Sequence, residues 1–307
     1  MAEKQAANQA AAAQAQELNL LDSIVDQGRF GADTPARERG KNLVKEFVGQ
    51  FLEGHMNVAR DVETMINQRI AQIDHLLSLQ LNEILHHADF QKLEGSWRGL
   101  RHMVFNSNTS ANLKIRVLNA NKKDLLRDMQ RAPEFDQSAL FKKVYEEEYG
   151  VFGGAPYGAL IGDFEFGKHP EDVELLEKIS QVAAAAHAPF FAAAAPSLVN
   201  LDSWTQIDAP RDLAKIFDST EYAKWKGFRQ SEDSRYVGLC LPRTLGRLPY
   251  GRETKPVEEF NYEEAVDGSD HSKYTWSNAA YSLGTRMADS FMNYGMCVSM
   301  RGVEGGG

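Results

Sequence analysis

The sequence predicts an α/β (mixed α+β) fold, in which helices flank a parallel or mixed sheet, with a long N-terminal helix and an extended N-terminal arm. The first observation is in residues 157–199, where two apolar runs enclose an amphipathic stretch. The second is a helical repeat of apolar residues through 61–86, and the third is the Ala- and Gln-rich, low-complexity start at residues 1–16. Together they predict a globular α/β body preceded by a helix and a tethered segment.

Residues 157–199 predict a strand, a helix and a second strand, the order of a βαβ unit. The first apolar run, in YGALIGDFEF, does not alternate strictly, which is typical of a strand covered on both faces. The helix begins well, because Pro170 suits the first helical position and the helix dipole favours Glu171 and Asp172 in the first turn. We expect this unit to form the middle of the sheet. One stripe of the helix is apolar: Val173, Leu175, Leu176, Ile179 and Val182.

The rest of the chain predicts further short elements around this unit. Residues 113–120, LKIRVLNA, alternate apolar and basic side chains, which predicts a half-exposed strand. An apolar strand is expected at the start of 235–251, before a Pro- and Gly-rich loop, and residues 252–273 are expected to form a polar surface loop. We expect residues 1–42 to be an arm and linker and 43–307 to form the α/β domain. Shorter helices are predicted at 122–129, 138–149, 209–217, 219–228 and 276–292.

Composition excludes several classes of protein. Hydrophobic residues make up 43% of the 307 residues and charged residues 25%, which is ordinary for a globular protein. The net charge of −9 disfavours nucleic-acid binding, which needs a basic face. No apolar run approaches the ~20 residues of a membrane span, and no signal peptide is recognised. Cys240 and Cys297 lie in apolar runs and are expected to be buried free thiols.

Two apolar segments lie outside the predicted sheet. In the helix at 61–86, one side carries residues stepped by threes and fours, and this side either packs on the core or pairs with a partner helix. In the arm, a short amphipathic piece follows the low-complexity start, and it either folds back or docks on another subunit. The helix stripe is Val62, Ile66, Ile70, Ile73 and Leu77, and the arm piece is Leu18, Leu20, Leu21, Ile24 and Val25.

The candidate chemical motifs are weak. Residues 162–168, GDFEFGK, have the spacing of a phosphate loop, but His169 replaces the hydroxyl residue that holds magnesium and the loop interior is acidic. Asp163 and Glu165 share a strand face and could form an acid–base pair, which keeps an α/β enzyme as the alternative function. No metal or cofactor site is expected.

A Pro- and Gly-rich loop at 241–252 carries three arginines. Arg243, Arg247 and Arg252 could bind an anion, or could pair with acidic groups of a neighbour or of the same chain.

Five blocks of sequence resemble one known family. They are LLDSIVDQGR at 20–29, HHADFQKLEGSWRGLRHMV at 86–104, FGGAPYGALIGDFEF at 152–166, AHAPFFAAAAPSLV at 186–199 and LPRTLGRLPYG at 241–251. They occur in the order found in the large subunit of the type VI secretion contractile sheath, the TssC/VipB family. The resemblance covers nearly the whole chain from Leu18.

The resemblance implies a structural protein of the bacterial cytoplasm, with no enzymatic activity and no cofactor. Such a subunit pairs with a small sheath subunit (TssB/VipA-like) and polymerises with neighbouring copies around an inner tube above a baseplate. Contraction propels the tube and its spike, and an AAA+ unfoldase acts on the contracted sheath. The family's arm lends a strand to a sheet shared between neighbours, and its chain continues beyond residue 307 into an inner layer that contacts the tube.

Overall fold

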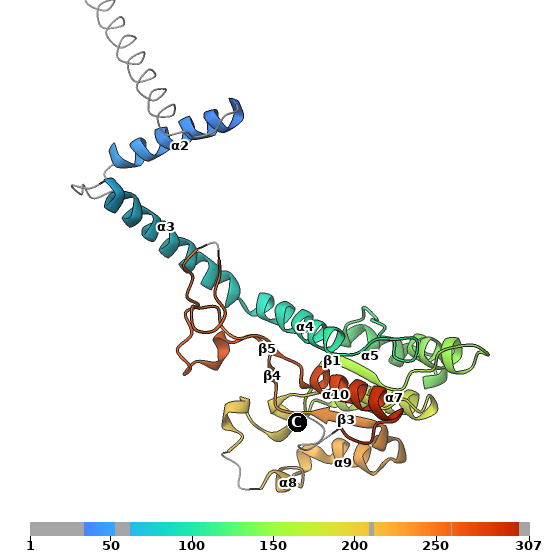
Figure 1. Cartoon of the computed structure of the whole chain (residues 1–307). Helices are drawn as coiled ribbons and strands as arrows, with labels where there is room; N and C mark the ends of the chain where they lie inside the picture. Colours follow the sequence, from blue (N-terminus) through green and yellow to red (C-terminus); the bar gives the residue numbers. More distant parts are fainter. Residues whose placement is uncertain (1–33, 53–61, 209–211, 259, 301–307) are drawn as a thin grey trace, which may run out of the picture. The chain divides into compact units, whose positions relative to one another are not determined.

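The computed structural model describes residues 34–52, 62–208, 212–258 and 260–300. Its contacts divide the chain into two units, residues 1–77 and 78–307. The first unit holds helix α2 (Thr34–Leu52) and most of α3 (Val62–Leu85), whose last residues belong to the second unit (Figure 1). The long helix predicted at 61–86 is thereby confirmed, while the expected boundary at residue 42 stays a prediction.

A small parallel sheet lies at the centre of the second unit, in the order β1-β2-β3. The strands are β1 (Leu160–Phe166), β2 (Phe190–Ala194) and β3 (Val237–Cys240). Leu160 lies opposite Phe190, which lies opposite Val237. Helix α7 (Pro170–Ala185) connects β1 to β2. The predicted βαβ unit is confirmed, in a mixed α/β fold that is mostly helical, but only β2 lies in the middle of the sheet, whereas β1 lies at its edge.

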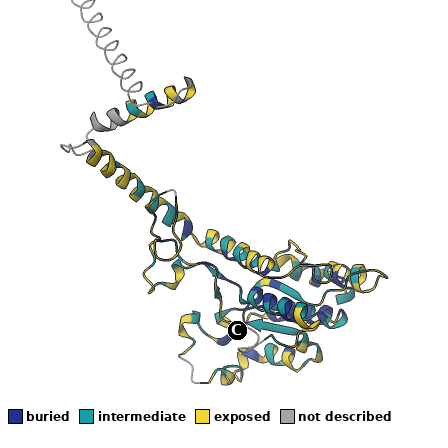
Figure 2. Ribbon diagram, in the orientation of Figure 1, coloured by how far each residue is buried: buried dark blue, intermediate teal, exposed yellow. Residues whose placement is uncertain are grey.

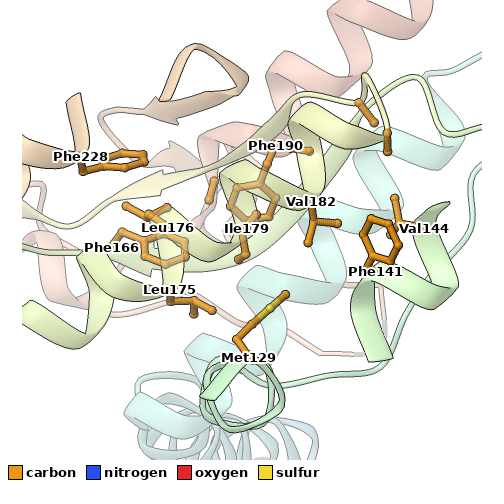
Figure 3. Packing of buried hydrophobic residues seen from close by; sticks show 14 of the residues in the cluster. Met129, Phe141, Val144, Phe166, Leu175, Leu176, Ile179, Val182, Phe190 and Phe228 are labelled. Carbon is orange, nitrogen blue, oxygen red and sulfur yellow. The ribbon is translucent and has the colours of Figure 1, made fainter. Parts of the chain in front are cut away.

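Helix α7 builds the core on one face of the sheet. Pro170 occupies its first turn, and the His169 side chain at the N-cap accepts a hydrogen bond from the Glu171 amide. The predicted apolar stripe is buried, and burying each large aliphatic side chain contributes about 1.5–3 kcal/mol. Figure 3 shows this stripe against aromatic residues of the strands and of the neighbouring helices. The core includes Leu175, Leu176, Ile179, Val182, Phe166, Phe190, Met129 and Phe141.

Other helices surround this core. The predictions at 122–129, 138–149, 219–228 and 276–292 are confirmed within a few residues, whereas Leu213–Ile216 is the helical part of 209–217 and residues 209–211 lie outside the described chain. A two-stranded antiparallel sheet joins β4 (Thr244–Leu245) to β5 (Trp276–Ser277). The remaining helices are α4 (Ala88–Phe105), α5 (Lys122–Arg131), α6 (Ala139–Phe141), the π-helix η2 (Lys142–Tyr149), α8 (Leu213–Ile216), α9 (Ala223–Gln230) and α10 (Ala279–Tyr294). Single 3₁₀ turns are η1 (Phe135–Gln137), η3 (Pro196–Val199), η4 (Trp204–Gln206), η5 (Thr220–Tyr222), η6 (Glu232–Tyr236) and η7 (His271–Lys273).

Helix α10 packs on the three strands and on α4. Two glycines let α4 approach its neighbours closely. A Cβ atom at Gly95 would collide with the carbonyl oxygen of Trp276, and one at Gly99 would collide with Ser277 and the ring of Tyr281. The glycines of the EGSWRG motif therefore serve helix packing.

Three local predictions differ from the structure, the first entirely and the other two in part. Residues 113–120 belong to no strand among the described residues, because alternation predicts a strand only where a neighbouring edge is available for pairing. The expected polar surface loop at 252–273 contains buried Tyr262 and Glu264. Cys240 and Cys297 are free thiols as expected, but the first is half-buried and the second exposed.

Candidate interaction surface

The apolar stripe of α3 is exposed in the structure. Ile66, Ile70, Ile73 and Leu77 are between 41% and 50% exposed, and Figure 2 shows this helix largely in the exposed colour. Ile84, seven residues after Leu77, lies on the same side of the helix by its spacing and is 49% exposed. The stripe therefore runs along most of the helix without a cover among the described residues.

A different face of the end of α3, where residues 78–85 belong to the second unit, contacts the segment around residue 264 of that same unit. Leu85 is buried, and the side-chain oxygen of Asn82 accepts hydrogen bonds from the Tyr262 hydroxyl at 2.7 Å and from the Ala265 amide at 3.2 Å. Leu85 follows Ile84 by about 100° around the helix. The end of α3 is held by this second face, which leaves the side of Ile84 free for another contact.

Part of the predicted surface lies outside the described residues. This applies to the whole arm piece, Leu18, Leu20, Leu21, Ile24 and Val25, and to the side chain of Val62. Their role stays a prediction.

Helix α4 carries a second group of exposed apolar side chains that sequence reasoning missed. Leu93, Trp97 and Phe105 are 56%, 64% and 73% exposed. The spacing of Leu93 and Trp97, four apart on one helix, was the available signal. The buried side of α4 is instead formed by Gly95, Gly99 and Met103.

Arg247 is buried in ion pairs within the chain. Its guanidinium donates to both carboxylate oxygens of Glu264, at 2.6 and 3.0 Å, and to Glu94 at 2.7 Å. His86 Nε2 lies 3.4 Å from Glu264. Of the possibilities left open by the sequence, the structure shows pairing with the same chain. Arg247 presents no exposed guanidinium, so it is not part of the surface.

Glu94 and Glu264 are residues that the sequence did not single out. Burial raises the pKa of Glu94, but hydrogen bonds from Arg247, Arg98 and Thr275 outweigh burial and hold this pKa below its ordinary value. The Glu94 carboxylate is therefore ionised. It accepts hydrogen bonds from Arg98 of α4, from Arg247 in the loop after β4 and from Thr275 just before β5. No local pattern indicates these partners, since Glu94 and Arg247 are 153 residues apart.

The acidic pair at the end of β1 does not converge on a reactive group. Arg243 binds both carboxylate oxygens of Glu165, at 2.5 and 2.7 Å. Asp163 is exposed, and its carboxylate lies next to the Tyr281 hydroxyl, whose pKa is raised chiefly by burial. Because Arg243 neutralises Glu165, these two residues form a structural ion pair. Asp163 and Glu165 therefore do not have the geometry of an acid–base site.

The phosphate-loop spacing is also accounted for by internal contacts. The Gly167 amide, which would face a phosphate, donates to Asp172 at 2.7 Å. Lys168 donates to Asn200 and Glu221 at 3.0 and 2.8 Å. These contacts use the groups that a nucleotide would need. Within the described residues, no group of three His, Cys, Asp or Glu side chains has metal-binding geometry.

Two comparisons place the chain among known proteins. Residues 67–307 match the family model described as VipB, EvpB/VC_A0108, tail sheath N-terminal domain. The chain is also 49% identical over 274 residues to the type VI secretion system sheath protein TssC1 of Pseudomonas aeruginosa, an alignment that covers 89% of this chain. It spans 55% of the length of that relative. Over the described ranges, no helix is both long and apolar enough to cross a membrane. The chain belongs to the VipB family of tail sheath proteins.

Proposed function

We propose that this chain is the N-terminal part of a structural subunit of the type VI secretion contractile sheath. In this proposal it pairs with a small sheath subunit and polymerises around the inner tube in the bacterial cytoplasm. Contraction of the polymer propels the tube and its spike. Family membership and 49% identity to a protein named as a type VI sheath protein support the proposal.

The single observation that carries the proposal is the exposed stripe of α3. Ile66, Ile70, Ile73 and Leu77 repeat at helical spacing and remain between 41% and 50% exposed. Large contiguous apolar faces on soluble proteins mark interaction sites. A partner helix that covers them would remove four large side chains from water, and full burial of each is worth about 1.5–3 kcal/mol. We assign this stripe, with Val62 at its start, to the small sheath subunit.

Co-purification with the small subunit tests the assignment. Ile70→Asp with Ile73→Asp places two charges in the stripe and should abolish the complex, while the α-helical circular dichroism of the chain is kept. The matched control is Gln68→Asp with His75→Asp, which adds the same charge on the opposite, exposed side of α3 and should retain the complex. A folded stripe variant that still binds the partner would show that the stripe serves another contact.

The same proposal gives the arm a role between heterodimers. Leu18, Leu20, Leu21, Ile24 and Val25 would dock on a neighbouring copy, in line with a short apolar piece on a polar tether. Removal of residues 1–28 from the full-length subunit should then leave the heterodimer intact but prevent ordered tubes in electron micrographs. The inner tube, the baseplate and an AAA+ unfoldase are the further partners of this proposal. Arg243 is half-exposed beside Glu165 and can contribute a rim charge to such contacts.

A further inference from the structure

A large cleft lies between segment 113–120 and the sheet. Its volume is about 2110 Å³, and it lies entirely within the second unit. Segment 113–120 forms one wall and strand β1 the opposite wall, while α10 lines a third side. The walls are largely apolar and include Leu113 and Ile115, Ile161 and Phe164, and Met287 and Phe291.

Strand β1 presents an unpaired edge to this cleft. Among the described residues, β1 pairs with β2 alone. The Leu160 amide donates to Pro189 at 2.9 Å, on the β2 side, so the backbone groups of Ile161 point to the other edge. At the end of that edge, Lys122 Nζ donates to the Glu165 carbonyl oxygen at 2.7 Å. Strand β1 has seven residues, and native proteins usually keep an edge strand short or cover it, so an uncovered edge of this length is unusual.

The opposite wall has the sequence of a strand without a partner. Leu113 and Ile115 are half-buried and alternate with exposed Lys114 and Arg116. The segment has no regular secondary structure and leads into α5, which packs on α7. Arg116 donates hydrogen bonds to Glu148 of η2 and to the hydroxyl of Tyr157, which precedes β1. The alternation of half-buried and exposed side chains thus predicts a strand in this segment, but among the described residues no other strand pairs with it.

The size of the cleft fits a β-strand. A strand of seven residues is about 23 Å long, at roughly 3.3 Å per residue. With a cross-section of about 4.8 Å by 10 Å in a layered fold, such a strand occupies roughly 1,100 Å³, which is less than the volume of the cleft.

We propose that the cleft is filled by a β-strand from the same polypeptide, from the part of the full-length subunit beyond residue 307. The chain spans 55% of its relative, and the matching family model is that of an N-terminal domain. Cys297 and Met300, at the end of the described chain, line this same cleft. The described chain thus reaches the cleft at Met300, and a domain normally completes its core with its own polypeptide. The inserted strand would join segment 113–120 to β1 in one sheet.

Photo-crosslinking in the full-length subunit, co-expressed with the small subunit, tests the occupant. A benzoylphenylalanine at Ile115 should link to a peptide beyond residue 307 of the same polypeptide, with no increase in mass on a denaturing gel. The control position is Phe152, which is exposed and outside the cleft lining and should not form this link. A link from Ile115 to the small subunit or to a second copy, or no link at all, would overturn the proposal.

Amide hydrogen exchange gives a second, independent readout. In the 307-residue chain the Ile161 amide, on the free edge of β1, has no strand beside it, whereas in the full-length subunit it would be hydrogen-bonded. We expect its exchange to slow by about 100-fold or more in the full-length protein, with no comparable change at Phe152. Equal exchange rates in the two proteins would contradict strand insertion.

Discussion

Arg247 Nη1 lies 2.6 Å from Glu264 Oε2, in an ion pair whose side chains are only 4% and 1% exposed. The same guanidinium binds Glu94, so one arginine joins α4, the loop after β4 and the segment around residue 264. Removing these charges from water costs free energy that their attraction largely offsets, so the net gain in stability is small. The consequence of the pair is positional, because it holds the 241–251 loop against α4.

Loss of the Arg247 guanidinium should be strongly destabilising. Arg247→Ala leaves the buried Glu264 carboxylate without its arginine and leaves Glu94 with Arg98 alone, and breaking such a buried pair costs about 3–5 kcal/mol. Urea unfolding followed by circular dichroism measures this change. Arg252→Ala, which removes an exposed arginine of the same loop, should cost less than about 1 kcal/mol. Similar small losses for both variants would mean that the buried pair relaxes or admits water.

Acid should weaken the fold through Glu94. Its pKa in the folded state is lowered from 4.5, because hydrogen bonds from Arg247, Arg98 and Thr275 outweigh the opposing effect of burial. A carboxyl group with a depressed folded-state pKa binds more protons when the chain is unfolded. Its contribution is therefore complete above about pH 4.5 and is lost as the pH falls from there toward the folded-state pKa. Unfolding free energy measured between pH 6 and pH 3 should fall more steeply for the natural chain than for Glu94→Gln.

The glycines of α4 should resist substitution. Alanine normally stabilises a helix by about 1 kcal/mol relative to glycine. At Gly95, however, the added Cβ collides with the Trp276 backbone, and overpacking of this kind costs about 1–3 kcal/mol. Gly95→Ala should therefore lower the melting temperature. Gly227→Ala, in α9 with open space around it, is the matched control and should raise it.

Apolar side chains on α4 and α7 should differ sharply in their effect on stability. Leu176 is fully buried in the core, and Leu176→Ala should cost about 2–5 kcal/mol. Trp97 is 64% exposed, and Trp97→Ala should change the free energy of unfolding of the isolated chain by no more than about 0.5 kcal/mol. A large loss at Trp97 would show that its ring is covered by the chain itself.

Local sequence patterns predicted the elements that form through interactions between residues close together in the chain. The βαβ unit was predictable because α7 carries a helical apolar stripe with Pro170 at its start, between two short apolar runs. Helix α3 was predictable from the spacing of its isoleucines. The stripe alone could not distinguish core packing from an open surface, since both require the same residues. Only the burial of Leu85 beside exposed Ile84 separates the two faces.

Long-range pairing accounts for what local patterns missed. Segment 113–120 has the alternation of a strand, yet strand formation needs an adjacent edge, and β1 lies across a cleft from it. Glu264 looked like one more acidic residue of a surface loop, but its partner Arg247 and the nearby Tyr262 bury it. Asp163 and Glu165 share a strand, but the contact with Arg243 decided the role of Glu165.

By itself, the sequence determined the α/β class, the βαβ unit, the long apolar-striped helix and, through five blocks of residues, the sheath family. These follow from periodicity and short motifs, which act between residues close in the chain. Among the described residues, the tertiary structure alone decided that Arg247 is buried with Glu94 and Glu264, that the α3 stripe is uncovered, and that one edge of β1 faces a cleft. Such outcomes depend on contacts beyond the range of helix and strand periodicity, from the 17 residues between Arg247 and Glu264 to the 153 between Glu94 and Arg247, so no local spacing carries a signal for them.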